Sequence, residues 1–203
     1  DVYKRQGDAR DGAPVRIAVP VLRRIANFDD LDPLAGETDV DVTLVEAGDV
    51  IPADADLILL PGSKSTISDL TFLRDQGWDI DIAAHLRRGG MVMGLCGGYQ
   101  MLGTKLDDPD GVEGPAGDTP GLGHLRVETL LAGDKRLTQV TAHANAFDVP
   151  VRGYEIHMGR TDGPDCDRPF LTLDGRPEGA VSADGAVIGT YLHGIFADDG
   201  SRR

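Results

Sequence analysis

Cysteine is scarce in this sequence, and the usual metal-binding patterns of cysteine and histidine are missing from it. Among 203 residues there are two cysteines, Cys96 and Cys166, and five histidines. No Cys-x-x-Cys or His-Glu-x-x-His pattern occurs, and the histidines are scattered along the chain. Because two isolated cysteines cannot make a disulfide framework, the sequence predicts a reduced, cytoplasmic protein without a metal site.

Basic residues and long apolar runs are also few. The chain has 20 Lys and Arg against 34 Asp and Glu, which gives a formal net charge of -14. This excess of negative charge argues against a nucleic-acid partner or an anionic membrane surface. No apolar run approaches the length of a membrane span, so we expect no membrane partner either. The length and the hydrophobic content of 40% suit one α/β domain with a sizeable core.

The two ends of the sequence differ in character from the rest. Asp1 to Gln6 resembles the translation of a sequencing-library transposon end, so we interpret residues 1–6 as a scar and assign residues 7–203 to one domain. Residues 198–203 stop as if a helix were beginning. We therefore expect a fragment whose true N-terminal part is missing and whose C-terminus is also cut.

Apolar runs and helical stretches alternate through the first half of the sequence. This alternation predicts an α/β fold with a mostly parallel, doubly wound sheet flanked by helices. From residue 122 onward the predicted strands follow one another without long helices, which predicts an antiparallel extension. The expected strands are 14–21, 40–45, 56–60, 91–95, 122–131, 138–143, 153–157, 170–173, 179–182 and 187–192, the helices 66–75, 79–88 and 99–102, and the polar loops 27–34, 107–120 and 160–169.

One cysteine stands at a predicted strand-to-helix corner. Cys96 follows the apolar run Met91 to Leu95 and is flanked by Gly94, Gly97 and Gly98. Small neighbours allow a sharp turn that holds a side chain at the carboxyl edge of a sheet, above a helix N-terminus that favours the thiolate. The alternative is a buried, inert cysteine that serves packing. The loops at 27–34 and 61–66 follow neighbouring strands and should meet Cys96 at the same edge.

A nucleophilic cysteine needs a base nearby, and the sequence offers several histidines. His193 ends a buried strand just before Gly194, and we favour it over His157, which is otherwise a strand histidine or a substrate contact. His85 is expected to be structural or exposed, and His124 and His143 receive no role. Cys166 lies between Asp165 and Asp167, whose charges would raise its pKa, so it is a poor nucleophile.

Four ordered stretches of the sequence together resemble the glutamine amidotransferase domain of cobyric acid synthases. They are Leu59 to Lys64, Gly94 to Gly103, Gly153 to Arg160 and Gly189 to Phe196, and the likeness extends over residues 14–200. The resemblance implies a class I glutamine amidotransferase-like, flavodoxin-like fold that hydrolyses glutamine through a Cys–His pair. It implies Cys96 as nucleophile and His193 as base, the Gly62 and Gly97 amides as oxyanion hole, and Gln100 beside the glutamine.

The resemblance also implies a partner domain that receives the ammonia. In this family a synthetase domain uses ATP and Mg²⁺ to amidate four carboxylates of a corrin substrate in cobalamin (vitamin B12) biosynthesis. Nothing in the sequence resembles that domain, so we expect no cofactor in this chain and at most glutaminase activity from it.

One position departs from the broader class I pattern. Those enzymes usually carry His-x-Glu, whereas Ile195 stands at the third position here. The residue that orients His193 is therefore unassigned, and the candidates are Asp29, Asp30 and Glu155. Without an orienting residue the imidazole of His193 would be less well held, so we expect weak glutaminase activity.

Three other interpretations remain open from the sequence. The chain resembles, to a lesser degree, the amidotransferase domain of cobyrinic acid a,c-diamide synthase and the subunit that amidates cell-wall lipid precursors. The stretch Tyr154 to Arg160 favours the cobyric acid type. The third interpretation is a docking module that kept the fold without catalysis. Such a module would tolerate Cys96→Ser without loss of any activity.

Overall fold

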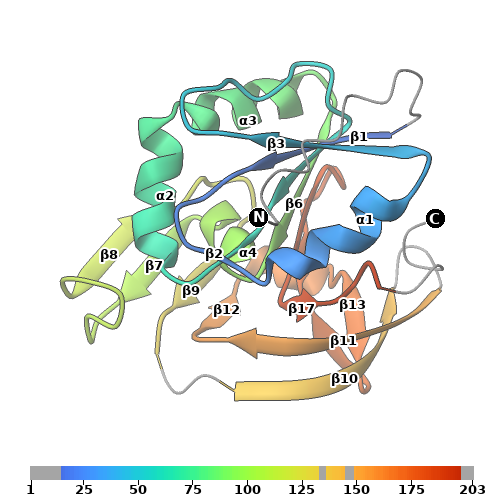
Figure 1. Cartoon of the computed structure of the whole chain (residues 1–203). Helices are drawn as coiled ribbons and strands as arrows, with labels where there is room; N and C mark the ends of the chain where they lie inside the picture. The colour runs from blue at the N-terminus through green and yellow to red at the C-terminus, as the bar shows by residue number, and fades with distance from the viewer. Residues whose placement is uncertain (1–14, 133–135, 145–148, 198–203) are drawn as a thin grey trace.

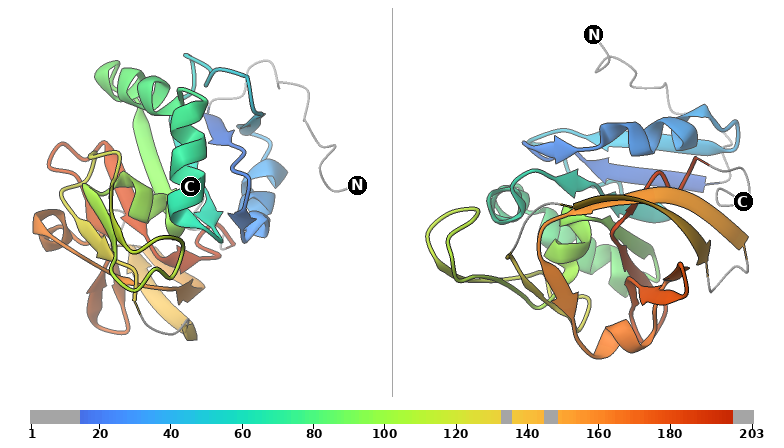
Figure 2. Two further views of the ribbon diagram at one scale, coloured as in Figure 1. Left: turned by 90° about the vertical axis from the view of Figure 1, so that its left-hand side faces the viewer. Right: turned by 90° about the horizontal axis from the view of Figure 1, so that it is seen from below.

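The structure, a computed structural model, describes residues 15–132, 136–144 and 149–197 (Figure 1). The predictions for residues 1–6 and 198–203 lie outside this part of the chain. The views in Figure 2 place the blue N-terminal strands and helix on one side of the molecule and the yellow-to-red second half on the other. No helix in the described ranges is long and apolar enough to cross a membrane.

A six-stranded sheet forms the centre, in the order β15-β16-β6-β4-β1-β3. Neighbouring strands are parallel except β15 with β16, as the alternation of strands and helices predicts. Its strands are β1 (Val15–Pro20), β3 (Val40–Val45), β4 (Leu57–Leu60), β6 (Met91–Leu95), β15 (Ala180–Val181) and β16 (Val187–Thr190).

Both faces of this sheet are buried, which explains why its strands are almost continuously apolar. Ala18 and Ile58 face a core built with the helices α2 (Thr66–Asp75), α3 (Trp78–Arg87) and α4 (Gly97–Leu102). Val19 and Leu59, one residue further along each strand, face a second core. That second core is completed by the segment η2 (Phe28–Leu31) and α1 (Asp32–Gly36) and by strands of the second half.

The predicted antiparallel extension consists of two sheets. One has the order β14-β13-β10-β11-β17 and the other β12-β9-β7-β8. A short ladder also joins β2 (Ile25–Ala26) to β5 (Gly62–Ser63). The remaining elements are β7 (Lys105–Asp108), β8 (Gly117–Pro120), β9 (Glu128–Leu130), β10 (Arg136–Ala144), β11 (Val149–His157), β12 (Arg160–Asp162), η3 (Pro164–Asp167), β13 (Leu171–Leu173), β14 (Arg176–Glu178) and β17 (Leu192–His193).

Several predicted elements were wrong in detail. The loop expected at 107–120 contains the end of β7 and all of β8, which pair with each other although their residues are polar. The loop expected at 160–169 contains β12 and η3, and the loop at 27–34 is largely η2 and α1. The single strand expected at 187–192 is interrupted at Tyr191, so that β16 and β17 belong to different sheets.

Candidate active site

Cys96 occupies the corner between β6 and α4 in a backbone conformation that side chains rarely adopt. Its φ and ψ are 50° and −107°. A Cβ on Gly98 would lie 2.3 Å from the Leu60 carbonyl oxygen, and one on Gly94 would lie 2.6 Å from the Tyr99 nitrogen. The chain therefore needs glycine at both positions to pack this turn. A strained cysteine position of this kind is typical of functional sites.

His193 and Asp30 meet beside this corner. Nδ1 of His193 lies 2.6 Å from one carboxylate oxygen of Asp30, and the Gly194 N–H donates to the other oxygen at 2.7 Å. Both side chains are almost completely buried, with His193 1% and Asp30 5% exposed. The carboxylate thus fixes the ring orientation through Nδ1 and leaves Nε2 as the ring nitrogen that does not bind Asp30.

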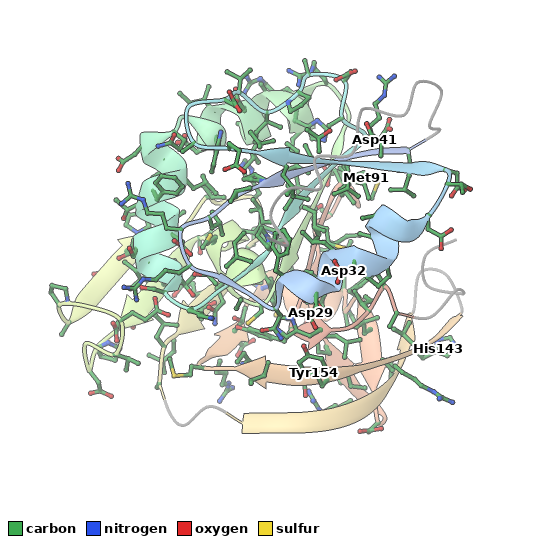
Figure 3. All side chains as sticks on the ribbon, viewed as in Figure 1. Asp29, Asp32, Asp41, Met91, His143 and Tyr154 are labelled. Atoms are coloured by element: carbon green, nitrogen blue, oxygen red, sulfur yellow. The ribbon has the colours of Figure 1, made fainter. Side chains whose placement is uncertain are left out.

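Neighbouring residues also pack against a face and an edge of the His193 imidazole. The Tyr154 ring stacks on His193 with 5.4 Å between ring centroids and 22° between planes. The Asn27 side-chain amide donates to the Tyr154 hydroxyl at 2.6 Å. A Cβ on Gly62 would come within 3.3 Å of His193 Cε1. Figure 3 shows Tyr154 on β11 next to the segment that carries Asp29 and Asp32.

The surroundings of His193 favour its protonated form. Burial alone would lower its pKa, but the Asp30 hydrogen bond and the neighbouring Cys96 outweigh burial and raise the pKa to about 9. Nε2 is buried and has no hydrogen-bond partner among the residues that the structure describes. Cys96 is buried, with 8% of the residue exposed, and its thiol donates weakly to the Ile156 carbonyl at 3.5 Å. The interactions with Asp30 and Cys96 therefore keep a proton on the imidazole of His193.

The other acidic candidates lie elsewhere. Asp29 is exposed one residue before Asp30. Glu155 forms an ion pair with Arg176. Glu155 also alternates with Tyr154 along β11 and so points to the opposite face of the strand from His193. Of the three orienting residues considered from the sequence, Asp30 is the one that contacts the imidazole.

Three further histidines and the second cysteine are placed as follows. His157 stacks on Tyr191 at 3.7 Å between centroids, and burial lowers its pKa. His85 is buried and hydrogen-bonded to the Met91 carbonyl, so of the two roles expected for it the structural one applies. His143 is exposed on β10 (Figure 3). Burial raises the pKa of Cys166, and the nearby carboxylates raise it further, as the sequence predicts.

The loop after β4 packs directly against the helix that follows Cys96. A Cβ on Gly97 would lie 2.8 Å from the Ser63 backbone nitrogen. At one end of the ladder between β2 and β5, the Lys64 N–H donates to the Arg24 carbonyl. Two residues away along each strand, Ala26 pairs with Gly62. Because hydrogen-bonded and non-bonded pairs alternate in antiparallel ladders, the Gly62 amide is directed to the Ala26 carbonyl. The Ser63 amide, in the non-bonded pair, is the one that faces away from this ladder.

Gln100 is buried in a network that the sequence did not reveal. Its side-chain nitrogen donates to the Met158 carbonyl at 2.9 Å and to the Tyr191 hydroxyl at 3.2 Å. Its oxygen accepts from the Thr66 hydroxyl at 3.0 Å. Both of its donors are therefore used within the protein. Gln100 ties α4 to α2 and to the turn after β11, and so it shapes the wall of the site.

Comparison with solved structures defines the class of this fold. The chain superposes on PurLQS from Thermotoga maritima with a TM-score of 0.68 over 93% of this chain and 94% of that one, at 20% identity. It superposes on a glutamine amidotransferase from the same organism with a TM-score of 0.60 over 89% and 76%, at 15% identity. The fold is that of the class I glutamine amidotransferases.

Comparison of sequences identifies the branch within this class. Residues 16–201 match the CobB/CobQ-like glutamine amidotransferase domain, and the chain belongs to this family. It is 60% identical over 196 residues to a cobyric acid synthase of Bradyrhizobium diazoefficiens, covering 97% of this chain and 41% of that protein. It is 62% identical over 191 residues to the cobyric acid synthase of a Ruegeria species, covering 94% and 40%. The chain thus spans about two fifths of the length of these relatives.

Proposed function

We propose that this chain hydrolyses glutamine to glutamate and ammonia, with Cys96 as nucleophile, His193 as proton shuttle and Asp30 as the residue that orients the imidazole. The observation that carries the proposal is the geometry of His193. One ring nitrogen is fixed on a buried carboxylate, and the ring also interacts with the side chain of Cys96, which occupies a strained strand-to-helix turn. A nucleophile, a base and an orienting group in this order are the components of acyl-transfer catalysis.

In the first half-reaction the Cys96 thiolate attacks the side-chain carbonyl carbon of glutamine. A carbon–sulfur bond forms and the carbonyl oxygen becomes an oxyanion. His193 then gives the proton on Nε2 to the amide nitrogen, the carbon–nitrogen bond breaks, and ammonia leaves. A glutamyl thioester on Cys96 remains, with His193 neutral.

In the second half-reaction the neutral His193 takes a proton from water. The resulting hydroxide attacks the thioester carbonyl, and the carbon–sulfur bond breaks to release glutamate. The Cys96 thiolate and the protonated His193 are restored, so the cycle consumes one glutamine and one water. The raised pKa of His193 keeps its imidazole protonated at neutral pH, with a proton to give to the leaving nitrogen.

Backbone amides would stabilise the oxyanion in both halves. The Gly97 amide follows the nucleophile and begins α4. The ladder between β2 and β5 engages the Gly62 amide, so we assign the second donor to Ser63, whose nitrogen lies against Gly97. Gly62 would instead allow the close approach of the His193 ring, and Gln100 would line the glutamine pocket through the Met158 turn.

The ammonia would be used by a synthetase domain in the part of the longer relatives that this chain does not span. By the names of those relatives, the whole protein would be a cobyric acid synthase. The family resemblance then implies a ligase that uses ATP and Mg²⁺ to amidate four corrin carboxylates, taking adenosylcobyrinic acid a,c-diamide to adenosylcobyric acid. This chain would need no cofactor of its own. A cytoplasmic location would fit the two cysteines, both of which are free.

The deciding experiment is labelling with a diazo-ketone analogue of glutamine, followed by intact mass and peptide mapping. Wild type and Cys166→Ser should each gain one adduct on Cys96, and excess glutamine should suppress it. Cys96→Ser should gain none. Labelling of Cys166, or of Cys96 without protection by glutamine, would contradict a glutamine site and favour a docking module.

A further inference from the structure

The strand that delivers His193 is broken just before it reaches the site. β16 ends at Thr190 in the central sheet, and β17 begins at Leu192 in the antiparallel sheet. Tyr191, between them, belongs to neither sheet. A backbone that leaves one ladder for another loses its sheet partners at that point, and those polar groups need other partners when buried.

Glu178, at the end of β14, supplies those partners. One of its oxygens accepts the Tyr191 N–H at 2.6 Å, and the other accepts the Thr190 hydroxyl at 2.7 Å. The Thr190 hydroxyl oxygen in turn accepts the Leu192 N–H at 3.0 Å. Glu178 is 6% exposed and Thr190 is fully buried. The carboxylate therefore satisfies the Tyr191 N–H and the Thr190 hydroxyl at the break without solvent.

The same short segment holds both members of the catalytic pair. The Thr190 carbonyl accepts the Cys96 N–H at 2.8 Å. Three residues further, His193 pairs with Tyr154 across β17 and β11. The conformation of the break at Tyr191 thus sets how the Cys96 backbone and the His193 ring face each other.

We propose that Glu178 is a positioning residue for glutamine hydrolysis, whose carboxylate holds the break between β16 and β17 so that His193 faces Cys96. The inference rests on the proposed function. It differs from the role of Asp30, because Glu178 binds Thr190 and Tyr191 and so acts on the backbone that carries the imidazole. Glu178 lies on β14, whereas the glutamate of the broader class I pattern would stand at Ile195, after the end of β17.

Several ionisable groups surround Glu178 and decide its charge. It lines a cavity of about 240 Å³ together with Glu155 and His157 of β11, Arg176 of its own strand, Tyr99 of α4, Cys166 of η3 and Arg160 of β12. Burial raises the pKa of Glu178 to about 7, against the lowering effect of the bonds from Thr190 and Tyr191, while Glu155 raises it and Arg176 lowers it. The carboxylate would therefore gain a proton as the pH falls below neutrality, and one of its two acceptor roles would be lost.

The test compares Glu178→Gln with wild type by the rate at which iodoacetamide alkylates Cys96 between pH 5.5 and 9, measured by peptide mass. Asp165→Asn is the matched control, since Asp165 is an equally buried carboxylate that binds Arg126 and Arg168. Wild type and control should show a drop in rate as the pH falls through about 7. Glu178→Gln should lack this inflection and react about tenfold more slowly at pH 8, where an amide cannot accept both bonds.

A folded Glu178→Gln with the wild-type pH profile would overturn the proposal, whatever its thermal stability. If that variant does not fold, Thr190→Val serves instead, because it removes one bond to the carboxylate and keeps the shape of the side chain. It should slow alkylation at pH 8 by a smaller factor, and an unchanged rate would overturn the inference. Glutamine turnover by wild type is measured in a separate assay. Absence of turnover would contradict the proposed function, whereas an unchanged alkylation profile in Glu178→Gln would contradict only the role of Glu178.

Discussion

Nδ1 of His193 lies 2.6 Å from a carboxylate oxygen of Asp30, a residue 163 positions earlier in the chain. The pair is buried and the same carboxylate also accepts the Gly194 N–H. The broader class I pattern places a glutamate two residues after the histidine, where this chain has Ile195. Here the imidazole is held from the opposite end of the sequence, by η2 after the first strand.

Replacing Asp30 should therefore disable the imidazole. Asp30→Asn keeps the shape but can hold the wrong tautomer of His193, and we expect kcat for glutamine hydrolysis to fall by about 10²- to 10⁴-fold. Asp29→Asn is the matched control, because Asp29 is exposed and one residue away. The measurement is glutamate release by each purified variant. Equal losses in both variants would show that the negative charge of η2, rather than the contact, is what matters.

Stability should depend on pH through the same pair. The pKa of His193 is raised from its ordinary 6.5 to about 9, so its contribution is fully present below pH 6.5 and is lost as the pH rises through 9. That contribution is on the order of 3 kcal/mol. Denaturant unfolding of wild type and Asp30→Asn should differ by more at pH 6 than at pH 10. A constant difference across this range would show that His193 is not the group involved.

Gly97 should not accept even one methyl group. In Gly97→Ala the new Cβ would press on the Ser63 backbone at 2.8 Å and separate the two amides proposed for the oxyanion. We expect kcat to fall by about 10²- to 10³-fold with a smaller change in KM. Gly36→Ala is the control, since no atom lies within 4 Å of its added Cβ, and it should change stability by less than about 1 kcal/mol. Full activity in Gly97→Ala would remove this amide from the mechanism.

The two cysteines should differ in reactivity. Burial and the carboxylates of Asp162, Asp165 and Asp167 raise the pKa of Cys166, whereas Cys96 faces a protonated imidazole. Brief treatment with iodoacetamide at pH 7.5 should label Cys96 at least about tenfold faster than Cys166 by peptide mass. Faster labelling of Cys166 would mean that the imidazole does not hold a thiolate on Cys96.

The stacking ring on His193 gives a further test. Tyr154→Phe removes the hydrogen bond from Asn27 but keeps the ring, and Tyr154→Ala removes both. Aromatic stacking is worth about 0.5–1.5 kcal/mol, so kcat should fall by roughly 2- to 10-fold in the alanine variant beyond any loss in the phenylalanine variant. Steady-state kinetics of the two variants measures this difference. If both lose the same amount, the hydroxyl rather than the stacked ring positions His193.

Local pattern was enough to predict much of the fold. The alternation of apolar strands and helices predicts the parallel sheet, because strands buried on both faces carry few polar residues. The predicted strands at 40–45 and 91–95 agree with β3 and β6 to the residue. The β7–β8 hairpin was missed because its strands are polar and exposed on one side, so their composition is that of a loop.

The sequence by itself determined which residues could carry the chemistry. Glycines around Cys96 specify a turn that no other residues would fit, and a histidine at the end of a buried strand is recognisable without a structure. Only the tertiary structure decided which carboxylate reaches that histidine, that the Gly62 amide is engaged by β2, and that the last strand breaks at Tyr191. These features depend on contacts between segments far apart in the chain, and local propensity carries no information about which distant groups packing will bring together.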